Sequence, residues 1–141
     1  MIQRESSLRM ILQVVVAGTL AGASLALAHH SFSMFDMTKK VTLDATVTEF
    51  QWTNPHVYIE VDVPSATGPA QHWSVELGSP SILLKGGWKH NDLKKGDKAK
   101  IIVSPLKNGM SGGFLEEITL SDGRKLGNGP GRGPQAAPQA K

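Results

Sequence analysis

The sequence predicts an all-β domain with one short helix: a small five-stranded OB-like barrel, with the helix between strands three and four. Three observations support this fold class. Apolar and polar residues alternate with a period of two through much of the chain between residues 41 and 126. One short segment breaks that period with residues that start and stop helices. Turn-forming stretches separate the alternating runs. A five-stranded sandwich or roll is the alternative arrangement.

The first predicted strand is long and changes phase. From Val41 to Val47 every second residue is apolar, but beyond Glu49 the apolar positions are Phe50 and Trp52, one step out of phase. This shift predicts a β-bulge or sharp bend near Glu49. A long bent first strand is also expected of an OB-like barrel.

The next two strands form a predicted hairpin. Asn54 before Pro55 indicates a turn, after which residues 57–63 alternate as a second strand. The stretch PSATGPA is typical of a hairpin loop, and residues 72–77 alternate as a third strand.

One helix and two strands complete the predicted barrel. Ser79 can cap a helix, Pro80 suits its first turn and Gly86 can end it. The fourth strand is predicted at Ala99–Val103 and the fifth at Phe114–Leu120, with a turn-rich segment before each.

The N-terminal residues are typical of a secretory signal peptide. Arg4 and Arg9 lie ahead of an uncharged apolar run, and Ala26 and Ala28 occupy the minus-three and minus-one positions of a cleavage site. A retained membrane anchor is the alternative, although Gln13 and two glycines dilute the run. We therefore expect a periplasmic or secreted protein with no membrane attachment after cleavage.

Cleavage at this site divides the chain into four parts. We predict a signal peptide over residues 1–28, an N-terminal arm over 29–40, the barrel over 41–126 and a disordered Gly/Pro-rich tail over 127–141. Removal of 28 residues from 141 leaves 113, the size of one domain. The chain has no cysteine, so it forms no disulfides, and a soft metal ligand has to be histidine or methionine.

Charge and aromatic placement argue against a nucleic-acid partner. The signal peptide carries two of the 15 basic and one of the 12 acidic residues, so cleavage lowers the net charge from +3 to about +2. Tyr58 is the one outward aromatic of the second strand and has acidic neighbours, whereas a stacking platform needs basic ones. We expect Trp52, Trp73 and Phe114 in the core, although Trp52, near the bend, could instead line a groove.

Several short motifs together resemble a known family. They are "AHHSF" at residues 28–32, Phe35-Asp36, "WTNPH" at 52–56, W-x-V-E-x-G-S-P at 73–80 and Gly87-Trp88. With them, nearly all the mature chain resembles a family of short exported bacterial proteins that is catalogued as a domain of unknown function. The resemblance implies a small periplasmic or secreted β protein, and it brings no agreed activity.

The predicted cut places a histidine at the new N-terminus. Cleavage after Ala28 would leave His29 first, where its α-amine and Nδ1 can chelate one metal ion. An imidazole from elsewhere would then complete a three-nitrogen site that suits Cu(II). His30 offers a second mode through the amine, the intervening amide and its own ring. Cleavage after Ala26 would place His29 third, which is also a copper- or nickel-binding arrangement. A flexible terminus with two histidines and no metal is the alternative.

Other residues could complete or support such a site. His56, which follows the Asn-Pro turn, is the candidate for the third nitrogen, although its ring could instead bond to the turn backbone. Asp36 could orient an imidazole or cap a turn. Met34 and Met37 could hold Cu(I) or pack the arm. The remaining histidines, at positions 72 and 90, are expected to be exposed.

Two hypotheses of different class follow, and we favour the first. The first is a periplasmic copper-binding protein whose metal site uses His29 with His30 or His56. The second is a metal-free OB-like module that binds a partner protein or small ligand, with His30, Phe32 and Phe35 packing the arm against the barrel. We expect no enzyme activity, because the sequence shows no nucleophile, oxyanion hole or phosphate loop.

Overall fold

The computed structural model describes residues 32–129. The predicted signal peptide, His29, His30 and residues 130–141 of the predicted tail therefore lie outside the described residues. The chain divides into two units, Met1–Met34 and Phe35–Lys141. Of the first unit, the structure describes a 3-10 turn, η1 (Phe32–Met34). Everything below concerns the second unit unless stated otherwise.

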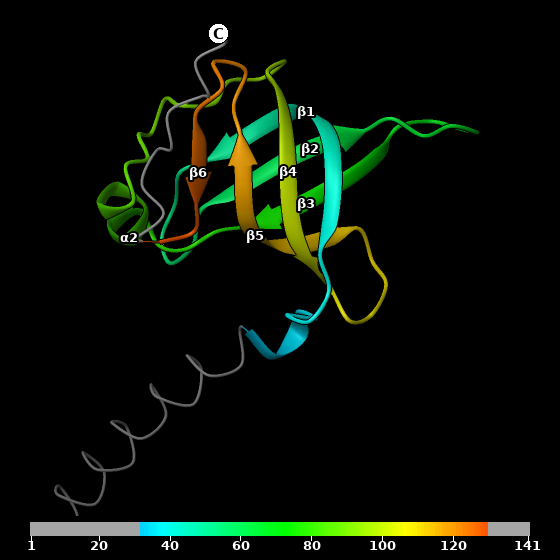
Figure 1. Cartoon of the computed structure of the whole chain (residues 1–141), viewed down its shortest axis with the longest axis horizontal. Coiled ribbons are helices and arrows are strands. Elements are labelled where there is room, and N and C mark those ends of the chain that lie inside the picture. The colour runs from blue at the N-terminus through cyan, green and yellow to red at the C-terminus, as the bar shows by residue number, and fades with distance from the viewer. Residues whose placement is uncertain (1–31, 130–141) are drawn as a thin grey trace, which may run out of the picture. The chain divides into compact units, whose positions relative to one another are not determined.

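The second unit is a barrel built from one mixed sheet (Figure 1). Its elements are β1 (Val41–Gln51), β2 (Tyr58–Val63), β3 (Gln71–Glu76), α2 (Pro80–Lys85), β4 (Lys98–Pro105), β5 (Gly112–Thr119) and β6 (Lys125–Gly127). The strand order is β3-β2-β1-β4-β5-β6, and a parallel pairing of β3 with β5 closes the first five strands into a ring. This confirms the predicted five-stranded OB-like barrel with its helix between β3 and β4. The short β6, which lies outside the ring, was not predicted.

The long first strand has the predicted bulge. Its register with β2 shifts between Val47 and Glu49. Before the bulge β1 pairs with β4, and from Thr46 onwards it pairs with β2. Because a bulge bends its strand and increases the local twist, one strand can serve two neighbours on a curved sheet. Closure of the barrel in turn leaves few open sheet edges.

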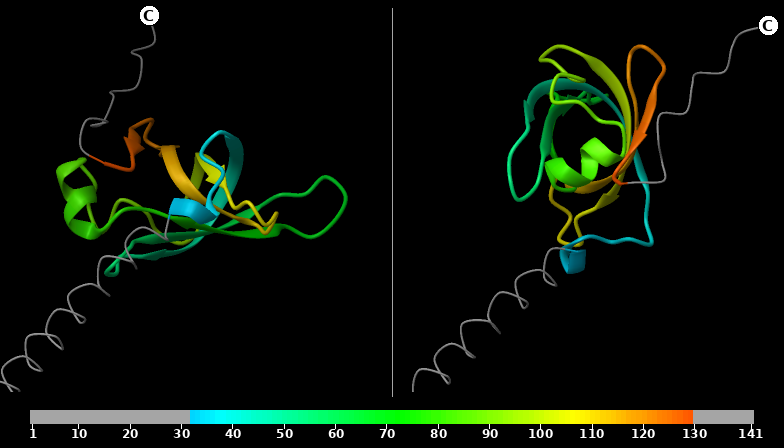
Figure 2. Two further views of the ribbon diagram at one scale, coloured as in Figure 1. Left: turned by 90° about the horizontal axis from the view of Figure 1, so that it is seen from below. Right: turned by 90° about the vertical axis from the view of Figure 1, so that its left-hand side faces the viewer.

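The core fills the inside of the ring, and α2 covers one of its open ends (Figure 2). Leu83 is the buried residue of α2, and Trp88 follows it into the core. The indole Nε1 of Trp88 donates to the carbonyl of Gly127 over 2.8 Å, which ties the chain after α2 to β6. Full burial of each large apolar side chain contributes about 1.5–3 kcal/mol. Trp52 and Trp73 are partly buried and pack against this core, as expected.

The helix begins and ends where its sequence predicts. Ser79 holds the N-cap position in an extended conformation, but its hydroxyl bonds to Ser81 rather than to a backbone amide. The helix ends at Lys85, and the left-handed conformation that follows is adopted by Gly87 with φ 89°. Within residues 32–129, neither helix has the length and apolar character needed to cross a membrane.

The fifth strand starts earlier than predicted because of two glycines. A Cβ atom on Gly113 would lie 2.8 Å from the Cβ of Val103 and 2.9 Å from the carbonyl oxygen of Ser104. One on Gly112 would lie 2.7 Å from a methyl group of Leu106. Glycine is a poor strand former by propensity, yet only glycine fits where the strands approach this closely. Glycine is therefore required at position 113, where β5 meets β4, whereas the close neighbour of Gly112 is the end of a flexible side chain.

The first residues of the predicted tail contact the barrel. Gly127 ends β6, and the side-chain oxygen of Asn128 accepts a hydrogen bond of 2.6 Å from the amide of Gly78.

Candidate functional site

The outer face of β2 and β3 carries a group of interacting polar side chains. Because side chains alternate along a strand, the residues between the buried ones point outward. We call this set the hairpin face, and it comprises Tyr58, Glu60 and Asp62 of β2 with His72, Ser74 and Glu76 of β3. Cross-strand pairing places Tyr58 opposite Glu76, Glu60 opposite Ser74 and Asp62 opposite His72.

His56 lies at one end of this face, immediately before β2. Its Nδ1 is 2.7 Å from Oε1 of Glu76, and the two side chains are 30% and 13% exposed. Its backbone carbonyl accepts a hydrogen bond from the Thr53 hydroxyl, which closes the turn. The ring therefore contacts a carboxylate rather than the turn backbone. With Nδ1 directed at Glu76, Nε2 is the nitrogen left for another partner.

Glu76 is shared between His56 and Tyr58. The Tyr58 hydroxyl also bonds to Glu76, and the pKa of Tyr58 is raised, first by burial and then by the charge of Glu76. A carboxylate that accepts from two side chains is held in one orientation, and it holds the imidazole in turn.

The N-terminal arm is attached beside this group. The ring centroids of Phe35 and Phe114 are 5.5 Å apart, and the Asp36 amide donates to the Pro105 carbonyl over 2.8 Å. In the parallel pairing of β3 with β5, Phe114 is the register partner of Glu76. The expectation that Phe114 belongs to the core is wrong. This ring lies on the outer face of β5 under Phe35, which is only 3% exposed.

Asp36 caps the turn after this attachment. Its carboxylate accepts hydrogen bonds from the backbone and hydroxyl of Thr38, and it pairs with Lys39 at 3.0 Å. These interactions, the Thr38 bonds first, lower the pKa of Asp36 to about 2. Of the two roles considered for Asp36, the structure shows turn capping. Met34 and Met37 on either side are both exposed.

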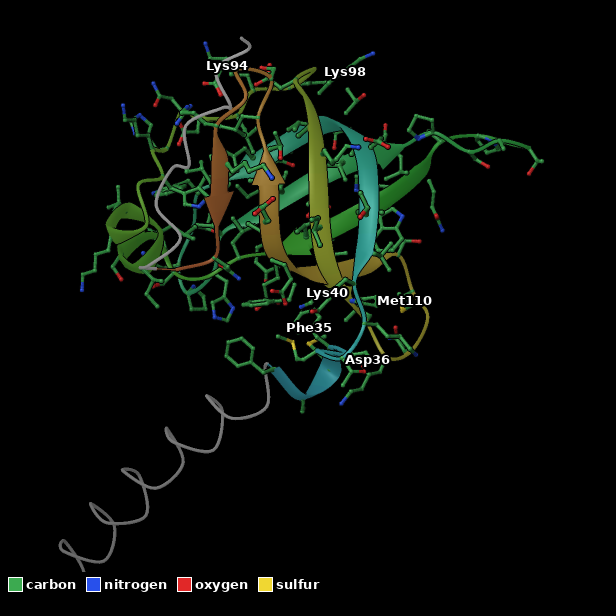
Figure 3. All side chains as sticks on the ribbon, viewed as in Figure 1. Phe35, Asp36, Lys40, Lys94, Lys98 and Met110 are labelled. Atoms are coloured by element: carbon green, nitrogen blue, oxygen red, sulfur yellow. The ribbon has the colours of Figure 1, made fainter. Side chains whose placement is uncertain are left out.

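A partly buried network attaches the same end of the arm to the sheet. Lys40 Nζ lies 3.0 Å from the fully buried hydroxyl of Ser104, and both groups contact the Glu116 carboxylate. Lys40 donates to the Ser104 hydroxyl, which in turn donates to Glu116, so the network attaches the end of the arm to β4 and β5. Figure 3 shows Phe35, Asp36 and Lys40 at one end of the barrel, and Lys94 and Lys98 at the other.

His72 makes two ring contacts on the hairpin face. Its Nδ1 is 3.0 Å from Asp62 and its Nε2 is 3.1 Å from Glu60, while Ser74 donates to the other oxygen of Glu60 over 2.8 Å. The pKa of His72 is raised, chiefly by the hydrogen bond to Asp62 and further by Glu60. His72 and His90 are exposed, as expected. The two carboxylate contacts were missed, although the hairpin register alone would have placed Asp62 opposite His72.

A shallow groove of about 400 Å³ lies near the end of the barrel that carries Lys98. Its lining includes Lys98, Lys100, Asp44, Thr46 and Ala45. Asp44 and Lys100, which are register partners on β1 and β4, form an ion pair of 3.4 Å there. No histidine lines it, so the groove is separate from the chemistry of the hairpin face.

The described part of the chain does not contain a complete metal site. Among residues 32–129, no three His, Asp or Glu side chains are grouped so that they could hold a metal ion. The structure places His56 beside Glu76, while the other two candidate ligands, His29 and His30, lie outside these residues.

Comparison with known proteins gives one match. The profile of a family of unknown function, DUF6152, matches residues 16–116. No curated protein and no solved structure matches the chain significantly. The match covers more than half of the chain, from the apolar N-terminal run to the middle of β5. The chain therefore belongs to the family of unknown function DUF6152.

Proposed function

We propose that the mature protein is an exported, periplasmic copper-binding protein. In this proposal His29, freed by cleavage after Ala28, binds Cu(II) through its α-amine and Nδ1, and His56 contributes Nε2. Three nitrogens in a tetragonal arrangement suit Cu(II), which also has the highest affinity among divalent first-row ions. The protein would hold, deliver or sequester the metal.

The contact between His56 and Glu76 is the observation that carries the proposal. Histidines that bind metals almost always donate their other ring N–H to a carboxylate, a carbonyl or water, which fixes the tautomer and raises ligand basicity. His56 has this arrangement before any metal is bound, with Nδ1 at 2.7 Å from Glu76.

The arm is attached next to the partner of His56. Phe35 packs over Phe114, which is the register partner of Glu76. The proposal requires residues 29–34, which precede this attachment, to bring the nitrogens of His29 to Nε2 of His56.

His30 supplies the competing mode within the same proposal. The amine, the intervening amide nitrogen and the ring of His30 can occupy three positions on Cu(II), which leaves a fourth position for His56. The two modes cannot both be complete on one ion, and they differ in whether the His30 amide is deprotonated.

A titration of the purified mature protein tests the proposal. Its N-terminus is first sequenced, and Cu(II) affinity is then measured for the wild type, a variant extended by three N-terminal alanines, H56Q and the control H90Q. The three alanines leave no histidine among the first three residues, so no other N-terminal chelate replaces the one at His29. We expect the extension and H56Q each to lower the affinity at least tenfold, and H90Q to leave it unchanged. Equal affinity in the wild type and the extended variant overturns the amine-dependent site.

A metal-free interaction module is the second candidate. The burial of Phe35 over Phe114 supports it, since this packing attaches the arm without any metal. Phe32, which was also expected to pack the arm, is 52% exposed. In this case the hairpin face or the neighbouring loops would contact a partner protein or a small ligand. A mature protein that binds Cu(II) no more tightly than its extended, H56Q and H90Q variants would favour this function.

A further inference from the structure

The sequence contains four asparagines, and the residue after each one decides how readily its side chain reacts with the backbone. An asparagine deamidates when the amide nitrogen of the next residue attacks its Cγ atom, so that residue needs an N–H group and little bulk beside it. Asn54 precedes a proline, which has no N–H, and Asn91 precedes an aspartate. Asn108 and Asn128 both precede glycine, which has no side chain to hinder the attack.

We propose that Asn108 is a site of spontaneous deamidation, and that the fold protects Asn128 from the same reaction. The Gly109 amide nitrogen loses its proton and bonds to Cγ of Asn108, and the side-chain nitrogen takes up a proton and leaves as ammonia. Water then opens the resulting cyclic imide at either carbonyl, so the product is aspartate or isoaspartate. The two steps together exchange ammonia for water and need no other reactant. This modification is independent of copper binding.

The side chain of Asn108 is folded over the backbone that follows it. Residues 107–110, in the loop between β4 and β5, are exposed. The Met110 amide donates to Oδ1 of Asn108 over 3.0 Å. Because this bond spans Gly109, it holds Cγ of Asn108 beside the Gly109 amide. The same N–H group faces the oxygen on which negative charge develops during the attack, and such a donor stabilises that charge.

The backbone of Gly109 is free to move into the position for attack. Its φ is 78°, and a Cβ atom there would meet nothing within 4 Å beyond its chain neighbours. Its amide donates to the Leu106 carbonyl over 3.3 Å, which exceeds the usual range of about 2.7–3.2 Å. Release of so long a bond costs little, and it frees the attacking nitrogen.

Asn128 has the same neighbour in sequence but is held by the barrel. Its Oδ1 accepts from the Gly78 amide over 2.6 Å, and its Nδ2 is buried with no hydrogen-bond partner among the described residues. Gly129 packs against Gly86, where a Cβ atom would lie 3.0 Å from the Gly129 carbonyl oxygen. Attack at Asn128 therefore requires local unfolding, because its side chain is bonded to another segment and water does not reach the nitrogen that has to leave.

Peptide mapping of the aged protein tests the proposal. The mature, copper-free protein is incubated in mildly alkaline buffer at physiological temperature and then digested at mildly acidic pH, where deamidation is slow. Mass spectrometry follows the peptides that contain Asn108 and Asn128. We expect Asn108 to deamidate at least tenfold faster than Asn128, with isoaspartate among its products. In a parallel sample unfolded in urea, the two rates should become similar, since both asparagines then precede a free glycine.

Three results would overturn the proposal. The first is an equal rate at the two asparagines of the folded protein, or a faster rate at Asn128. The second is a difference that persists in urea, because the local sequence rather than the fold would then protect Asn128. The third comes from the control N108Q, whose longer side chain forms a cyclic imide far more slowly: an isoaspartate yield as high as that of the wild type would place the reaction elsewhere.

Discussion

The Nδ1 atom of His56 lies 2.7 Å from Oε1 of Glu76, and Phe114 is the register partner of Glu76 on β5. Glu76 and Phe114 are neighbours on the outer face of β3 and β5, and His56 precedes β2. Phe114 packs in turn against Phe35, where the N-terminal arm is attached. The fold thus links the position of the candidate ligand to the segment that carries the predicted mature N-terminus.

Replacement of Glu76 should weaken copper binding without removing a ligand. In E76Q the carboxylate charge is lost, so the His56 ring becomes a weaker donor and its orientation is less well held. Loss of such a partner costs about 10–100-fold in metal affinity. Cu(II) titration checks the result against the control E117Q, whose carboxylate pairs with Lys125 on β6. Equal affinities in E76Q and E117Q would show that Glu76 does not position His56.

The contribution of His72 to stability should depend on pH. Its pKa is raised in the folded protein by Asp62 and Glu60, so the folded state holds the proton more tightly than the unfolded chain does. The stabilisation is therefore fully present below the unfolded pKa of about 6.5, and it is lost as pH rises through the folded pKa.

Urea unfolding of the wild type and H72Q near pH 5.5 and at about pH 9 checks this sign. The wild type should exceed H72Q by more at the lower pH. Since His72 is 58% exposed, the pairs contribute only about 0.2–1 kcal/mol. A difference that is equal at both pH values, or larger at the higher one, contradicts the assigned contacts.

Loss of the indole hydrogen bond should destabilise the barrel. W88F removes the donor to the Gly127 carbonyl and leaves a buried acceptor unpaired, which costs about 1–3 kcal/mol in the free energy of unfolding. W73F is the matched control, because the Trp73 indole is only partly buried and bonds to the exposed side chain of Gln71. If both substitutions destabilise equally, the link between Trp88 and Gly127 is not specific.

The glycine at the closure of the barrel should not tolerate a side chain. In G113A the new methyl group would lie 2.8 Å from Val103, so the strands must shift, at about 1–3 kcal/mol. The control G68A adds a methyl group in open space and should change the free energy of unfolding by less than about 0.5 kcal/mol. Chemical denaturation of both variants measures these free energies of unfolding. A G113A variant as stable as the wild type would contradict the close approach of the strands.

The strand pattern predicted the fold well because each strand buries one face. The bulge near Glu49 could be predicted because the alternation of apolar residues changes phase there, and Pro80 and Gly86 indicated the two ends of the helix. Two features of the fold were not predicted, for physical reasons. β6 has three residues, too few for a periodic signal, and the start of β5 at Gly112 depends on a close approach that no local propensity encodes.

Less of the candidate site could be predicted than of the fold. His56 could be predicted as a candidate ligand because it is a histidine that follows a turn. Its partner Glu76 could not be predicted, because it is 20 positions away and is brought near only by the pairing of β2 with β3. Phe114 was assigned to the core because an aromatic on a strand is usually buried inward. The cover that Phe35 gives to the outer face is a tertiary contact, and only the structure shows it.

The central claim is that export creates the copper site, and metal analysis of the protein recovered from the periplasm tests it most directly. Native mass spectrometry should give a chain that begins at His29 with one bound copper ion. Electron paramagnetic resonance of that sample should show Cu(II) coordinated by nitrogen, with a signal that changes in H56Q. A chain that retains its leader, or a copper signal that is identical in H56Q, would contradict the account.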